Sequence, residues 1–127
     1  MAYRFRHHYT RDEARALLPD LRRWLIAMRE QRQELDKIDR RLAQLLQQGN
    51  DLGGPTVHAY VRRLADIKEL LDEFRTREIK IQDLDRGLID FPALIGSREV
   101  FLCWELDEED VEFWHDLDTG FAGREHL

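Results

Sequence analysis

The chain has 127 residues, of which 43% are apolar and 36% charged, and its formal net charge is −6. This length is that of one domain, and no apolar run reaches the roughly 18 residues of a membrane span. The acid excess disfavours nucleic acid as a partner, and the basic, aromatic first nine residues are unlike a secretory signal, so we expect a cytoplasmic protein.

The first expected element is a helix that begins after Thr10. Thr10 and Glu13 have the spacing of a capping box, in which the side chain of each accepts a hydrogen bond from the amide of the other. Pro19 lacks an amide hydrogen and its ring clashes with the carbonyl four residues back, so a kink or break is predicted there. Before the helix, the alternation of aromatic and polar residues over Tyr3–Tyr9 is compatible with an edge strand.

Two heptad patterns predict an antiparallel, coiled-coil-like helical hairpin over residues 10–77. In the first helix only Gln31 interrupts the apolar a and d positions, which are Ala14, Leu17, Leu21, Trp24, Met28, Leu35, Ile38, Leu42 and Leu45. After turn-forming residues at 49–55, the second helix carries Val57, Tyr60, Leu64, Ile67, Leu71 and Phe74. Two helices cannot enclose so wide an apolar stripe whereas four can, so we expect a homodimer.

From residue 78 to residue 127 the pattern is that of strands, which predicts a small, mainly antiparallel sheet of three to five strands. The expected strands are at 79–82, 88–91, 99–104 and 111–115, with turns at 85–87 and 96–97. Because segment 99–104 is apolar on both faces, the helices or a second subunit are expected to cover the second face. The predicted fold is therefore α+β within a single domain, residues 1–127.

Four sequence blocks resemble a known family. They are Ala14–Pro19 (A-x-A-L-L-P), Asp83–Ala93, Arg98–Trp104 and Trp114–Arg124. Together they resemble the small bacterial and chloroplast proteins catalogued as domain of unknown function 2203, and the resemblance covers essentially the whole chain. It implies a fold but no activity. Where that family commonly carries a glycine between the second helix and the next strand, this chain has Arg77 and Glu78.

His115 is the sharpest candidate for chemistry, because a histidine flanked by carboxylates can act as a general base or bind a metal ion. Strand alternation sends His115 and Asp116 to opposite faces, so another carboxylate has to complete such a site. The candidates are Asp118, Asp90 and Glu105. If a metal is bound, His115 is the expected ligand. In the alternative interpretation, His115 is a structural histidine hydrogen-bonded to a backbone carbonyl.

Gly120, Gly123 and Arg124 are the remaining candidate ligand-binding residues. Glycine amides can form an anion nest, and a guanidinium can bind a carboxylate or phosphate through two parallel bonds. The aromatic residues that would wall such a pocket are Trp104 and Trp114. Alternatively, Arg124 pairs with Asp116 or Asp118 and fixes the C-terminal segment.

The sequence contains no nucleophile–base pair, phosphate loop or metal-spaced cluster, and Cys103, between apolar neighbours, is expected to be a buried, unreactive thiol. This favours a non-catalytic, homodimeric binding or interaction module whose further partner is a protein or a small anionic ligand. The alternative is a small enzyme or metal-binding protein with a site built on His115 and nearby carboxylates. No pattern in the chain selects a cofactor.

Overall fold

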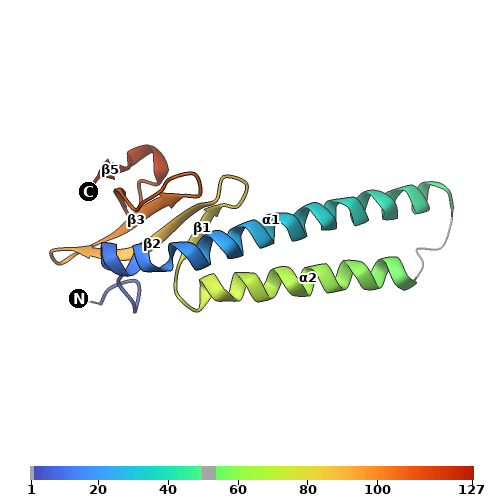
Figure 1. Ribbon diagram of the computed structural model, residues 1–127, viewed down its shortest axis with the longest axis horizontal. Coiled ribbons are helices and arrows are strands. Elements are labelled where there is room, and N and C mark those ends of the chain that lie inside the picture. The colour runs from blue at the N-terminus through green and yellow to red at the C-terminus, as the bar shows by residue number, and fades with distance from the viewer. Residues whose placement is uncertain (1, 50–53) are drawn as a thin grey trace.

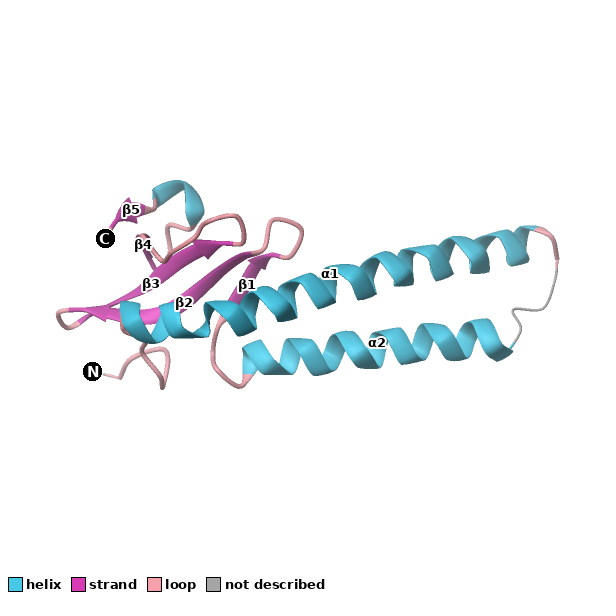
Figure 2. Ribbon diagram, in the orientation of Figure 1, coloured by secondary structure: helices cyan, strands magenta, loops and turns pink. Residues whose placement is uncertain are grey.

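Two helices and a five-stranded sheet form the computed structural model, which describes residues 2–49 and 54–127 (Figures 1 and 2). The helices are α1 (Arg11–Gln47) and α2 (Gly54–Arg75). The strands are β1 (Lys80–Asp83), β2 (Leu88–Ile95), β3 (Arg98–Glu105), β4 (Phe113–Asp116) and β5 (Glu125–His126), with a short 3-10 helix η1 (Phe121–Gly123) before β5. The predicted α+β class, a helical hairpin followed by an antiparallel sheet, is confirmed.

Helix α1 begins where the capping box predicts. The Thr10 hydroxyl accepts from the Glu13 amide at 3.1 Å, and the Glu13 carboxylate accepts from the Thr10 amide at 3.2 Å. Of the predicted kink or break at Pro19, the break is wrong, because α1 continues through the proline as one helix. Leu18 and Leu21 are buried on either side while Pro19 itself is exposed, so core packing offsets the missing hydrogen bond.

The helical hairpin projects well beyond the sheet, and both chain termini lie at the sheet end of the molecule (Figure 1). Only the sheet-proximal part of α1 is buried, through Ala14, Leu18, Leu21, Leu25 and Met28. In α2 the one buried residue is Phe74. Within residues 2–49 and 54–127, neither helix is apolar enough to cross a membrane. The turn predicted at 49–55 falls mostly on residues 50–53, outside the described part of the chain.

The five strands follow one another in the order β1-β2-β3-β4-β5, each antiparallel to the next. Strand β2 is longer than predicted and pairs along its whole length with β3 across the two-residue turn Gly96–Ser97. Gly87 ends the other predicted turn with a φ of 66°, and a Cβ atom there would lie 2.5 Å from the Leu106 Cβ. Glycine is therefore required at that turn.

The two faces of the sheet are covered by different parts of the chain. The first face packs on α1 through Ile89, Phe91, Val100, Leu102 and Trp104. The second face carries Phe101, whose ring lies 5.4 Å from that of Phe5 in the N-terminal arm, residues 2–9. On this face the N-terminal arm of the same chain, rather than either helix, contributes Phe5.

The N-terminal arm is held by carboxylates rather than by strand pairing, so the predicted edge strand over Tyr3–Tyr9 is absent. The amides of Arg4 and Phe5 donate to the Glu99 carboxylate at 2.8 and 3.0 Å, and the His8 ring bonds it at 2.7 Å. Burial alone would raise the pKa of Glu99, but these hydrogen bonds hold that pKa below its ordinary value.

A second carboxylate, Glu78, bonds the next stretch of the arm. It accepts from the amides of Arg6 and His7 at 2.9 and 3.0 Å. Its backbone φ of 58° lies in the left-handed region that normally favours glycine. Glu78 is therefore a strained backbone position whose side chain anchors the arm.

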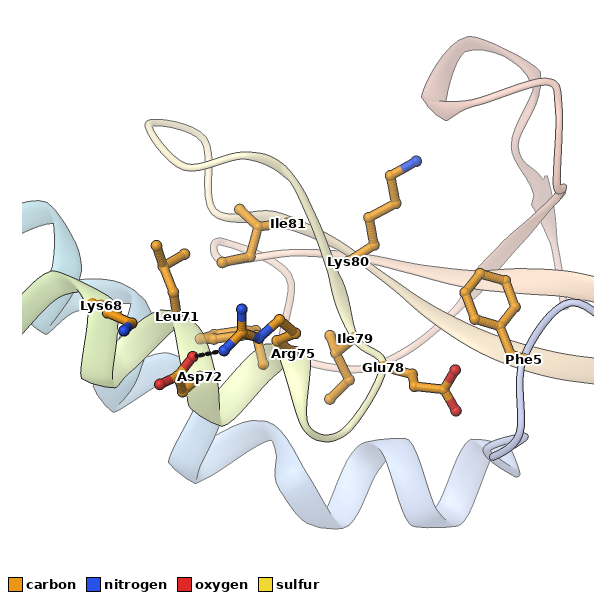
Figure 3. Close-up of a pocket in the computed structure, with 10 residues that line it drawn as sticks. Phe5, Lys68, Leu71, Asp72, Arg75, Glu78, Ile79, Lys80 and Ile81 are labelled. Atoms are coloured by element: carbon orange, nitrogen blue, oxygen red, sulfur yellow. Dashed lines mark hydrogen bonds and ion pairs between the residues drawn. The ribbon is translucent and has the colours of Figure 1, made fainter.

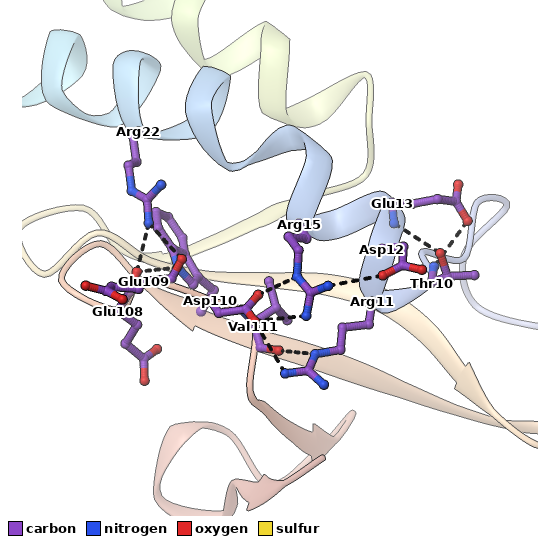
Figure 4. A network of polar contacts seen from close by, with 11 residues as sticks. Thr10, Arg11, Asp12, Glu13, Arg15, Arg22, Glu108, Glu109, Asp110 and Val111 are labelled. Atoms are coloured by element: carbon purple, nitrogen blue, oxygen red, sulfur yellow. Dashed lines mark hydrogen bonds and ion pairs between the residues drawn. The ribbon is translucent and has the colours of Figure 1, made fainter.

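An arginine network ties the start of α1 to the loop between β3 and β4 (Figure 4). Arg15 binds both carboxylate oxygens of Asp110, at 2.7 and 2.9 Å, and lowers the pKa of that carboxyl. Arg11 donates to the carbonyl of Val111 at 2.7 Å, and Arg22 donates to the carbonyl of Glu108 at 3.0 Å. These contacts fix the loop over the first turns of α1, so β4 enters the sheet from a defined position.

Candidate functional site

A cluster of three buried polar side chains occupies the second face of the sheet: Asp90 on β2, Cys103 on β3 and His115 on β4. Asp90 and Cys103 are direct cross-strand partners, and His115 pairs with Phe101, two residues before Cys103. Alternation along the strands therefore directs all three to one face. One potential ligand atom from each lies within 4.8 Å of the others, and all three residues are buried.

Asp90 and His115 form a hydrogen-bonded pair in which each remaining polar atom also has a partner. The His115 Nε2 lies 3.0 Å from Asp90 Oδ1, and its Nδ1 lies 2.7 Å from the carbonyl oxygen of Asp116. A carbonyl can only accept, so Nδ1 carries a hydrogen, and one further proton lies between Nε2 and Asp90. The Gln82 amide donates to Asp90 Oδ2 at 2.7 Å.

Cys103 completes the cluster and is buried, as predicted. Burial raises the pKa of its thiol to about 12, and the charge of Asp90 acts in the same direction. The nearby guanidinium of Arg124 opposes this rise. The thiol is therefore protonated near neutral pH, in keeping with the predicted lack of reactivity, although Arg124 is a basic neighbour that sequence proximity does not reveal.

We expect the free energy of unfolding to fall as the pH rises from about 9 to about 12, because the unfolded thiol ionises near 9 while the folded thiol keeps its proton. The raised pKa of the buried Tyr9 phenol acts in the same direction. Urea denaturation across this range checks the slope. In Cys103→Ala the part due to the thiol should disappear, and an unchanged slope in that variant would contradict the assignment.

Arg124 lies at the cluster but not with its predicted partners. It donates to both oxygens of Glu108, at 3.3 and 3.1 Å, and its guanidinium lies 3.8 Å from the ring centroid of Phe113. The predicted pairing with Asp116 or Asp118 is wrong. Arg124 directly follows the 3-10 helix η1, and its side chain reaches Glu108 rather than the aspartates nearer to it in sequence.

Those two aspartates have other partners. Asp116 is paired with Val100 of β3, on the face opposite His115, and it binds Arg98. Asp118 is 87% exposed and lies 3.6 Å from Arg4. Of the carboxylates proposed to complete a site with His115, the structure thus brings Asp90 to it and leaves Asp118 at the surface.

The other predicted site residues are dispersed. The amide of Gly123 donates to the carbonyl of Gly120 within η1, at 3.1 Å, so that amide is not available to an anion nest. Glu105 binds Arg86 at 2.8 Å. Trp104 is buried in the core on the first face. The guanidinium of Arg98 lies over Trp114, 5.7 Å from the centroid of the Trp114 ring. We therefore do not propose an anion site at residues 120–124.

A second candidate surface lies on α2. A pocket of about 500 Å³ opens between the C-terminal end of α2 and the edge strand β1 (Figure 3). Its apolar lining consists of Phe5, Leu71, Phe74, Ile79 and Ile81, and its charged residues are Lys68, Asp72, Arg75, Glu78 and Lys80. An apolar floor surrounded by charges of both signs is better suited to binding the surface of another protein than to binding a small ion.

From this pocket an apolar stripe, which we call the α2 stripe, runs along the helix through Val57, Val61, Leu64 and Leu71. These side chains are 42%, 58%, 43% and 44% exposed. The heptad prediction assigned three of them to the interior of the hairpin, which is wrong. The residues of α2 that face α1 form a neighbouring row on the helix, in which Tyr60 and Ile67 are partly buried and Phe74 is buried. The apolar face of α2 is wide enough for either row to pack on α1, and heptad spacing does not distinguish the two.

The fold and these two features define a small α+β protein with a projecting helical hairpin, a polar cluster inside its sheet and an open apolar helix face. The family model described as an uncharacterized conserved protein (DUF2203) matches residues 7–127, so the chain belongs to that family. No curated protein and no solved structure gives a significant match to this chain.

Proposed function

We propose that the protein is a non-catalytic interaction module that forms a homodimer through the α2 stripe. The observation that carries this proposal is the row of four aliphatic side chains on one face of α2, each more than two-fifths exposed. Their positions are separated by four, three and seven residues, which is the spacing of a single helical face. Contiguous apolar surface of this kind marks association sites in proteins that are otherwise well packed.

A second copy of this chain is the partner that fits the α2 stripe, because the stripe is nearly symmetrical about Leu64. Val57 and Leu71 lie seven residues to either side. If two α2 helices cross antiparallel at Leu64, each Leu64 meets its counterpart, and Val57 of one copy meets Leu71 of the other. A twofold axis requires such a self-complementary surface. The resulting four-helix arrangement encloses apolar surface that one hairpin leaves open.

A lysine that lies between two members of the α2 stripe is compatible with this packing. Lys68 occupies the helical position between Leu64 and Leu71, and it lines the pocket at the base of α2. A lysine can lay its methylene stem along apolar surface while its ammonium group reaches water. We also propose a cytoplasmic location, because the only cysteine of the chain is free.

Substituting Leu64→Glu is expected to dissociate the dimer, raising its dissociation constant by about 100-fold or more, because two carboxylates would face each other in an apolar contact. Sedimentation velocity over a wide concentration range measures this directly. The matched control is Ile26→Glu, on α1 outside the α2 stripe and 47% exposed, which should sediment as the wild type does.

Circular dichroism should show both variants folded, since both replaced side chains are already exposed. A wild-type protein that sediments as a monomer at every concentration would contradict the proposal. A dimer that Ile26→Glu disrupts as strongly as Leu64→Glu would place the interface elsewhere and would equally overturn it.

A further inference from the structure

We propose that Asp90, Cys103 and His115 bind one divalent transition metal ion of the borderline-soft class to which zinc belongs. The three residues come from three neighbouring strands and offer a carboxylate oxygen, a sulfur and an imidazole nitrogen, which is the donor set that such ions select. The inference is independent of the dimer, because the cluster lies inside the sheet and the α2 stripe lies on the hairpin.

The present spacing of the ligand atoms is close to what a metal ion requires. Zinc binds nitrogen and oxygen ligands at about 2.0 Å, so two such ligands at a tetrahedral angle are about 3.3 Å apart. His115 Nε2 and Asp90 Oδ1 are 3.0 Å apart, and the sulfur belongs to the same group of atoms within 4.8 Å. An opening of a few tenths of an ångström between the histidine and the aspartate, with the sulfur brought to about 3.5 Å from each of them, accommodates the ion.

The surrounding hydrogen bonds hold two of the three ligands in a metal-binding orientation. Metal-bound histidines usually donate their other ring nitrogen to a carbonyl or carboxylate. His115 does this with the carbonyl of Asp116, which leaves Nε2 directed at the cluster. Gln82 donates to Asp90 Oδ2, which leaves Oδ1 directed at the cluster. The two contacts fix the ring tautomer and the carboxylate rotation before any ion arrives.

The charges of the ligands also balance the charge of the ion. A thiolate and a carboxylate neutralise a dication, and Arg124 beside the sulfur is already paired with Glu108. On binding, the S–H bond of Cys103 breaks and a sulfur–metal bond forms, while the proton between His115 and Asp90 is displaced. Both protons pass to solvent, so two protons are released for each ion. Water fills the fourth position of a tetrahedral ion that has three protein ligands.

Titration of metal-free protein with Co²⁺ tests the site, because cobalt bound to a thiolate gives a near-ultraviolet charge-transfer band that identifies sulfur ligation. We expect one equivalent to bind, Zn²⁺ to displace it, and calorimetry in buffers of different ionisation enthalpy to report two protons released. Cys103→Ser should abolish the band, and His115→Phe should weaken binding by about 100-fold or more. The matched control, His58→Gln, changes an exposed histidine of α2 and should bind as the wild type does.

Gln82→Ala keeps every ligand and alters only an exposed neighbour, so it remains informative if a ligand variant fails to fold. This substitution should weaken metal binding by about 10-fold or more while retaining the charge-transfer band. Removing a hydrogen bond to a metal ligand lowers metal affinity by about this factor in other sites. Wild-type protein without a charge-transfer band at one equivalent of Co²⁺ would overturn the proposal, as would a band that persists in Cys103→Ser or binding that His58→Gln abolishes.

Discussion

Replacing Trp104 with alanine is expected to lower the free energy of unfolding by about 3–5 kcal/mol, the usual cost of deleting a large buried aromatic side chain. Trp104 is fully buried between the sheet and α1. Its indole nitrogen donates to the carbonyl of Glu108 at 3.0 Å, and the Arg22 guanidinium lies 5.2 Å from its ring. The substitution therefore opens a cavity and also removes two contacts to the loop between β3 and β4.

Differential scanning calorimetry measures this loss as a fall in the melting temperature of about 4 °C per kcal/mol for a domain of this size. Trp114→Ala is the matched control, because Trp114 is only partly buried and stacks with Arg98 at the surface. Trp114→Ala should lower the free energy of unfolding by clearly less than Trp104→Ala does. Equal losses at the two positions would show that Trp104 does not occupy the central place in the core.

Replacing Asp90 with alanine is expected to cost about 3–5 kcal/mol of unfolding free energy, because it removes one member of a buried, hydrogen-bonded pair and leaves the other without its partner. His115 Nε2 and the Gln82 amide would both lose their acceptor. Urea denaturation in the presence of a chelator measures the effect without any contribution from bound metal. Asp90→Asn retains an acceptor oxygen and should cost less than Asp90→Ala.

Asp118→Ala provides the comparison, since this carboxylate is 87% exposed and surface substitutions usually change stability by less than about 0.5 kcal/mol. If Asp90→Ala unfolded at the same urea concentration as the wild type, the buried pair with His115 would not be formed in solution. The metal proposal would then lose the positioning of two of its ligands.

The local features of the fold were predictable because they depend on residues close in sequence. The capping box at Thr10 and Glu13 and the turn at Gly96–Ser97 are patterns of two to four residues, and each is present in the structure. The break predicted at Pro19 fails for the opposite reason. The helix is held together there by contacts of Leu18 and Leu21 with the distant sheet, and tertiary packing overrides local preference.

The polar cluster was predictable only in part. Alternation correctly separated His115 from Asp116, but three carboxylates were equally eligible as its partner, and only the strand register selects Asp90. The apolar neighbours of Cys103 in the sequence indicate only a buried thiol and give no sign of a polar cluster. The approach of Arg124 depends on how η1 returns the chain to the sheet, which periodicity does not encode.

The strand order has a consequence for how the chain reaches this structure. Each strand pairs with its neighbour in sequence, so the sheet can zip together through short loops alone. The docking of α1 is different, since Arg11 bonds a residue 100 positions away. Closing so long a loop is entropically costly and slows folding. We therefore expect the association of α1 with the sheet, rather than the pairing of the strands, to limit the folding rate, which puts the helix that is synthesised first among the last elements to gain its full set of contacts.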